Sequence, residues 1–104
     1  MNMTPEQMRE LDAWIAENVM GWIAPMPPIY GNPQHGLQPF NPTTDPAAAM
    51  MVLEKCCEKV LVNAEIWKAG NGKWFCCTPN RSHVVSTETL PLAICLFAQK
   101  LFTK

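Results

Sequence analysis

Prolines crowd one stretch of this chain and limit what that stretch can form. Seven of the ten prolines lie between residues 25 and 46, in the segment PMPPIYGNPQHGLQPFNP and just after it. Proline has no backbone N–H and a fixed φ, so it interrupts helices and the interior strands of a sheet. The sequence therefore predicts a long loop over about residues 23–45, with a helix on either side. A loop of this length in a small domain is usually functional or mobile.

Two helix starts flank the proline-rich segment. Before it, Thr4 is followed by proline and by Gln7, which is a capping-box pattern, and apolar residues recur at three- and four-residue spacing up to Gly21. After it, TTDPAAAM offers a capping side chain, a proline and three alanines. We expect Asp45, or one of the two threonines before it, to cap a second helix over about residues 46–59.

The last helix, PLAICLFAQKLF, is apolar on more than one face. Either Thr87 or Thr89 can cap it. Leu92, Leu96 and Phe102 lie off its main apolar stripe, so the helix is either buried on two sides or part of an oligomer contact. With only 16% charged residues in the chain, this pattern slightly favours the oligomer contact and predicts a homo-oligomer.

Between the second and third helices the apolar pattern changes to alternation. VLVNAEIW, KWFCC and SHVVS indicate three short strands, with turns at residues 70–72 and 78–81. Their close spacing predicts an antiparallel meander. The order helix, loop, helix, three strands, helix over residues 1–104 predicts a single α+β domain, in which helices pack in layers on a small three-stranded sheet.

Charge and hydropathy exclude several classes of protein. The formal net charge is −1 and the eight Lys and Arg residues are scattered, so the chain lacks the field that generic nucleic-acid binding needs. The amino terminus has no basic segment followed by an apolar run, and no stretch approaches membrane-spanning length. We therefore expect a cytoplasmic protein that binds no membrane.

Five cysteines, at positions 56, 57, 76, 77 and 95, form two adjacent pairs and one single residue. An odd number without an export signal favours reduced thiols over a disulfide framework. Zinc sites usually space their ligands as C-x-x-C, whereas adjacent cysteines point apart on a helix or a strand. We expect buried free thiols and neither a metal site nor another cofactor.

Three blocks of the sequence resemble a known family. LDAWIAENVMGW, TTDPAAAMMVLEKC and TLPLAICLFAQKL are similar to the signature blocks of small phage proteins grouped as the phage ABA sandwich domain, with a weaker likeness to the NinX-type phage proteins. The resemblance implies a phage or prophage gene, expressed in the infected or lysogenic bacterial host, and a layered α/β fold. It implies no activity and no catalytic residues.

No catalytic motif is present. The two histidines belong to no H-E-x-x-H pattern, and there is no nucleophile elbow or Walker-type loop. Cys76 or Cys77 served by His83 would make a nucleophile and base on neighbouring strands, but such neighbours in a hairpin also arise by chance. The sequence therefore predicts a protein that is not an enzyme.

Aromatic rings beside the loops suggest a binding site. Flat rings can stack on a nucleobase, and hydroxyl, amide and guanidinium groups can bond to phosphate or ribose. The candidate ligand-binding residues are Trp22, Tyr30, Phe40, Thr43, Thr44, Asn80 and Arg81. The alternative for each ring is a place in the core, which is where tryptophan and phenylalanine usually lie in a small domain.

Two classes of function remain open. The first is a small-molecule binder that sequesters a nucleotide immune signal, which would suit a short phage protein without a catalytic set. The second is a protein-interaction module that docks on a host or phage protein through the last helix or the proline-rich segment.

Overall fold

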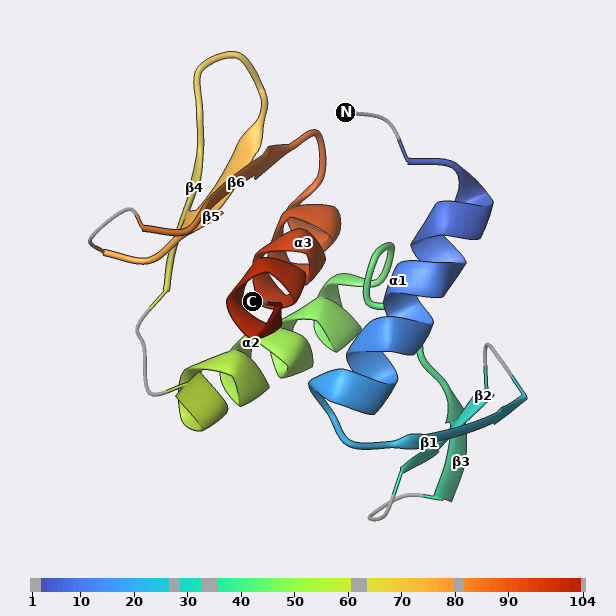
Figure 1. Cartoon of the computed structure of the whole chain (residues 1–104). Helices are drawn as coiled ribbons and strands as arrows, with labels where there is room; N and C mark the ends of the chain where they lie inside the picture. Colours follow the sequence, from blue (N-terminus) through green and yellow to red (C-terminus); the bar gives the residue numbers. More distant parts are fainter. Residues whose placement is uncertain (1–2, 27–28, 33–35, 61–63, 80–81, 104) are drawn as a thin grey trace.

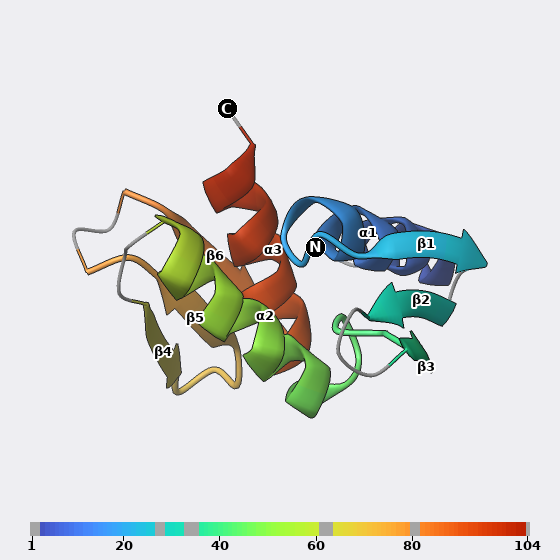
Figure 2. The same ribbon diagram turned by 90° about the horizontal axis from the view of Figure 1, so that it is seen from below.

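The computed structural model describes residues 3–26, 29–32, 36–60, 64–79 and 82–103. These residues form three helices that lie between two small antiparallel sheets, as Figure 1 and Figure 2 show from two sides. The elements in chain order are α1 (Pro5–Asn18), β1 (Ile23–Met26), β2 (Ile29–Asn32), β3 (Gly36–Pro39), α2 (Pro46–Val60), β4 (Glu65–Lys68), β5 (Trp74–Cys77), β6 (Val84–Thr87) and α3 (Leu90–Phe102). None of these described helices is long and apolar enough to cross a lipid bilayer.

The predicted α+β class and the antiparallel meander are confirmed. Strands β4, β5 and β6 pair in sequence order, with Ile66 opposite Cys76 and Cys76 opposite Val85. In the turn between β4 and β5, Gly72 has a φ of 87°, a conformation that glycine adopts without strain. The first strand was predicted to begin too early in the sequence. Val60, the first residue of the alternating segment VLVNAEIW, is the last residue of α2.

The proline-rich segment is not a continuous loop, and this prediction was wrong. Strands β1, β2 and β3 form a second antiparallel sheet within residues 23–39. Two of its prolines occupy positions that tolerate the missing N–H. Pro25 lies in an edge strand, where the pairing register shifts between Ile23 and Met26, and Pro39 is the last residue of the other edge strand. Edges, strand ends and bulges are the places where sheets accept proline.

Both predicted helix starts form as the capping patterns indicate. The Gln7 N–H donates to Thr4 Oγ1 at 3.1 Å, and the Thr4 N–H donates to Gln7 Oε1 at 2.9 Å. At the second helix the Ala47 N–H donates to Asp45 Oδ1 at 3.1 Å, so Asp45 is the capping residue. Helix α1 is followed by Gly21 at a φ of 72°.

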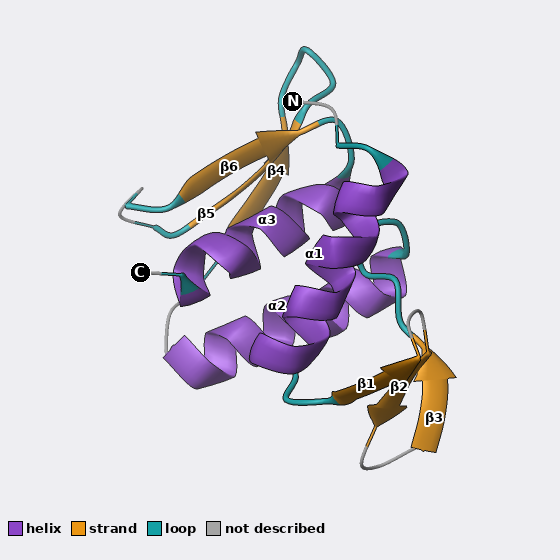
Figure 3. Ribbon diagram, turned by 45° about the vertical axis from the view of Figure 1, so that its right-hand side comes forward, coloured by secondary structure: helices purple, strands orange, loops and turns teal. Residues whose placement is uncertain are grey.

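Helix α3 is the centre of the core. It packs against α2, α1, β5 and β6, and Figure 3 shows it between the β4–β6 sheet and the other helices. Leu92 is buried, and Leu96 and Phe102 are partly buried against the core. The off-stripe residues therefore have partners within the chain, which is the first of the two explanations that the sequence left open. The homo-oligomer stays a prediction.

Candidate binding site

Trp22 and Phe40 lie together, but they belong to the core. Their ring centroids are 4.7 Å apart at an interplanar angle of 64°, an edge-to-face contact. Phe40 is only 2% exposed and Trp22 only 8%. Phe40 and Trp22 are therefore members of the buried core cluster, which is the alternative that the sequence left open for each ring, and a ligand-binding role for them stays a prediction.

Thr43 is also buried, where it bonds to a carboxylate from α1. Its N–H donates to Asp12 Oδ1 at 3.0 Å, and its hydroxyl donates to Asp12 Oδ2 at 3.2 Å. Burial raises the pKa of Asp12, and the two hydrogen bonds from Thr43 oppose that rise. The pair fastens the segment before α2 to α1, so Thr43 has a structural role.

The remaining predicted site residues are Thr44, Tyr30, Asn80 and Arg81. Thr44 is exposed and its hydroxyl donates to the Asn41 carbonyl at 3.3 Å. Tyr30 lies in β2, opposite Gln38. Asn80 and Arg81 lie outside the described residues, and the two strands that they connect, β5 and β6, lie across the helices from β1–β3 (Figure 1).

The cysteines belong to no metal-binding group among the described residues, and two of them are buried thiols with a raised pKa. All five are free thiols, and no group of three or more His, Cys, Asp or Glu side chains in the described ranges could hold a metal ion. Burial raises the pKa of Cys56 and of Cys76 to about 12. These two thiols therefore carry no thiolate at neutral pH, which a cysteine nucleophile requires.

A hollow of about 510 Å³ lies between β6 and the second half of α3. Its lining residues come from these two elements and the residue after α3: Val84, Val85, Ser86, Leu96, Gln99, Lys100 and Thr103. Val84 is 36% exposed, which is high for a large apolar side chain in a strand. We call this feature the β6–α3 groove.

One wall of the β6–α3 groove is the open edge of a sheet. Strand β6 ends the order β4-β5-β6, and no described strand pairs with its other side. The Thr78 N–H donates to the His83 carbonyl at 3.0 Å, and the His83 N–H donates to Thr78 Oγ1 at 3.2 Å, so the backbone groups of these two opposed residues face each other. Bonded and non-bonded pairs alternate in antiparallel sheets. The backbone groups of Val84 and Ser86 therefore face away from β5, toward the groove.

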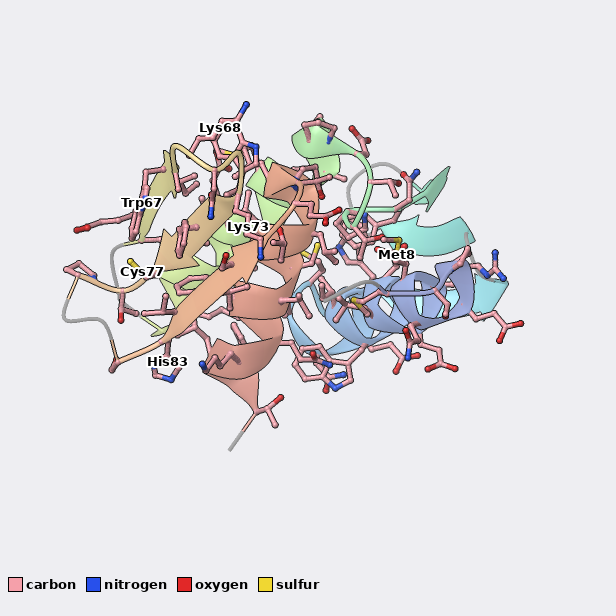
Figure 4. All side chains as sticks on the ribbon, turned by 90° about the horizontal axis from the view of Figure 1, so that it is seen from above. Met8, Trp67, Lys68, Lys73, Cys77 and His83 are labelled. Atoms are coloured by element: carbon pink, nitrogen blue, oxygen red, sulfur yellow. The ribbon has the colours of Figure 1, made fainter. Side chains whose placement is uncertain are left out.

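Lys100 is the one ionisable residue among those that line the groove. Its Nζ donates to the Val84 carbonyl at 3.3 Å, which agrees with the outward direction of that carbonyl. Other lysines lie elsewhere on the sheet. Lys68 Nζ is 5.8 Å from the Trp74 ring centroid, and Figure 4 shows Lys68 and Lys73 at the opposite end of the sheet from His83.

Sequence reasoning pointed to the elements of the groove but not to its residues. Leu96 stood out as an off-stripe residue of the last helix, and SHVVS was expected as a strand. Lys100 and Val84 are 16 residues apart, and Asp12 and Thr43 are 31 apart. No local pattern connects residues at such separations, so neither pair could be found before the fold was known.

The described fold has relatives among phage proteins. The chain is similar to that in a crystal structure of a phage protein from Bacillus cereus ATCC 14579, with a TM-score of 0.72 and 18% identity over 97% of this chain and 92% of that chain. No curated protein matches the chain. The family model described as the phage ABA sandwich domain matches residues 13–98, which include all three helices in whole or in part and both sheets. The chain therefore belongs to the phage ABA sandwich domain family.

Proposed function

We propose that this phage protein is a non-enzymatic interaction module that binds an extended segment of a host or phage protein in the β6–α3 groove. The observation that carries the proposal is the open edge of β6 beside a largely apolar hollow. Addition of a strand to a sheet edge gives affinity through main-chain hydrogen bonds and specificity through side-chain pockets. We place this activity in the cytoplasm of the infected cell.

The groove offers both parts of such a site. Val84 and Ser86 turn their backbone groups outward, so an added strand could bond to both residues. Leu96 and Val85 line the hollow beside them and could receive an apolar side chain of the partner. Natural proteins usually protect an open edge, and in this chain the exposed Lys100 side chain bonds to the Val84 carbonyl on that edge.

A selection with a matched edge variant tests the proposal. The probe is a display library of random peptides of about six residues, a usual strand length, with free carboxyl termini. Wild-type protein and Ser86→Pro are compared as bait. Proline removes the outward N–H of Ser86 and leaves the pairing with β5, because edge strands accept proline where the N–H faces outward.

The expected result is a set of peptides that bind wild-type protein and lose most of their affinity for Ser86→Pro. Leu96→Glu, which places a charge in the hollow, should reduce binding of the same peptides. If no peptide is enriched on wild-type protein, or if Ser86→Pro binds the enriched peptides equally well, the proposal is wrong.

A second candidate function is sequestration of a small anionic molecule, with a nucleotide immune signal as the case of interest. The groove volume of about 510 Å³ lies within the range of roughly 300–1,000 Å³ that is common for small-molecule sites, and Lys100 supplies a positive charge. Against a nucleotide, the Trp22 and Phe40 rings lie in the core, where they cannot stack on a base.

A nucleotide panel separates the two candidates. A nucleotide that binds the folded state must raise the melting temperature by mass action. The peptide-binding proposal expects no shift with mono-, di- or cyclic dinucleotides. A saturable shift that Lys100→Met removes would support the second candidate instead.

A further inference from the structure

We propose that the peptide partner is a carboxyl-terminal tail, whose terminal carboxylate pairs with Lys100 at the Val84 end of β6. This inference rests on the proposed function and specifies which extended segments the groove selects. It follows from the direction of the sheet, the position of one lysine and the distribution of charge along the groove.

The direction of an added strand follows from the sheet that it joins. Strands β4, β5 and β6 are all antiparallel to their neighbours, and antiparallel pairing is the more stable arrangement per residue. A segment added antiparallel to β6 runs from the Thr87 end toward the Val84 end. Its carboxyl terminus therefore arrives beside Val84.

Lys100 occupies that same end of the groove. Its ammonium lies 3.3 Å from the Val84 carbonyl oxygen and is exposed. An added strand needs the Val84 carbonyl for one of its own N–H groups. A carboxylate at this end would attract the ammonium and form an ion pair with it, in place of the bond from the ammonium to the neutral carbonyl.

The charges near the groove favour one orientation. His83 precedes Val84, and its ring bonds through Nδ1 to Ser82 at 3.0 Å. Lys100 is the one ionisable residue among those that line the groove, and it bonds to the Val84 carbonyl at this end. At the other end, Glu88 is exposed immediately after β6. A tail with its carboxylate beside Lys100 meets a cation, whereas the reversed tail would bring its carboxylate toward Glu88.

The experiment compares each peptide enriched on wild-type protein with its carboxyl-terminal amide. Both forms are titrated into full-length wild-type protein, Lys100→Met and Lys68→Met at low and high salt. Methionine keeps the length of the lysine stem without its charge, and Lys68 is the matched control because it lies away from the groove.

We expect amidation to weaken binding to wild-type protein by about tenfold, the order of one charge-assisted hydrogen bond. Lys100→Met should bind acid and amide equally, and Lys68→Met should keep the preference. Salt should reduce the preference, because the pair is exposed.

Three results would overturn the inference. If the free-carboxylate and amidated peptides bind wild-type protein equally, and Ser86→Pro still fails to bind them, the carboxyl-terminal tail is refuted but the peptide site is not. A preference that survives in Lys100→Met, with no change in self-association, places the carboxylate elsewhere. If Lys100→Met only increases self-association and leaves the preference unchanged, the lysine merely protects the edge. Absence of any peptide binding would refute the proposed function itself.

Discussion

Asp12 is a buried carboxylate whose two oxygens are both occupied by Thr43. Burial raises its folded-state pKa above the ordinary value of 3.8, so the folded state holds the proton more tightly than the unfolded state does. The contribution of Asp12 to stability is therefore greatest below the ordinary pKa. It falls as pH rises through the folded-state pKa.

Two variants of Asp12 separate its charge from its hydrogen bonds. Asp12→Asn cannot titrate; it keeps an acceptor for the Thr43 N–H, and its amide N–H can donate to the Thr43 hydroxyl instead of accepting from it. The stability of wild-type protein relative to Asp12→Asn should therefore fall as pH rises from 3.8 through the raised pKa and then level off. Asp12→Ala leaves the Thr43 donors unpaired and should cost about 1–3 kcal/mol. Urea denaturation at a series of pH values measures both effects, and a pH-independent difference between wild-type protein and Asp12→Asn would contradict the account.

Phe40 tests whether the aromatic pair is core. The ring is 2% exposed and touches Trp22 edge to face, so Phe40→Ala should reduce the free energy of unfolding by about 3–5 kcal/mol. Phe40→Leu should cost less, because it leaves a smaller cavity. A melting temperature for Phe40→Ala within a few degrees of wild-type protein would contradict the core role and favour the ligand-binding role that the sequence analysis considered for Phe40.

At the scale of the element, the start of α2 depends on one side chain. Asp45 accepts the Ala47 N–H, whereas Thr44 is exposed and bonds only to Asn41. Asp45→Ala should therefore cost about 1 kcal/mol, the usual value of an N-cap, and Thr44→Ala should cost less. Thermal denaturation of the two variants measures this order, and the reverse order would make the threonine the cap.

The outward direction of Ser86 in β6 has its own test. In the alternating pattern Val85 bonds to Cys76, and the Ser86 N–H faces away from β5. Val85→Pro should be less stable than Ser86→Pro by at least about 1 kcal/mol, since only the former loses a ladder hydrogen bond. If urea denaturation gave the two variants equal losses of unfolding free energy, the assignment of the Val85 N–H to the β5 ladder and of the Ser86 N–H to the open edge would be wrong.

Some elements could be predicted from the sequence because their signals are local. Capping residues at Thr4 and Asp45 and the alternation in β4–β6 depend on neighbours a few residues apart. The β1–β3 sheet was missed because proline was read as excluding strands, although Pro25 and Pro39 occupy positions where no N–H is needed. The β6–α3 groove was missed because it depends on how a helix and a strand cross.

At the scale of the molecule, the helices form a central layer and leave two sheets at the outside (Figure 2). The off-stripe apolar residues of α3 pack against the core of the same chain. The apolar pattern of this helix can therefore be explained without a contact to a second copy of the protein. The predicted homo-oligomer can be checked by sedimentation at micromolar concentration. A single species at 11.7 kDa would contradict the homo-oligomer and would leave the proposal for the β6–α3 groove unchanged.

The central claim is that a peptide becomes an additional strand on β6. Amide hydrogen exchange of the labelled full-length protein, with and without a selected peptide, observes that strand directly. The account predicts that the Ser86 amide exchanges quickly in the free protein and at least about tenfold more slowly with peptide bound. Val85 and Thr87, already bonded to β5, should change little. A bound peptide that leaves exchange at Ser86 unchanged would contradict the claim.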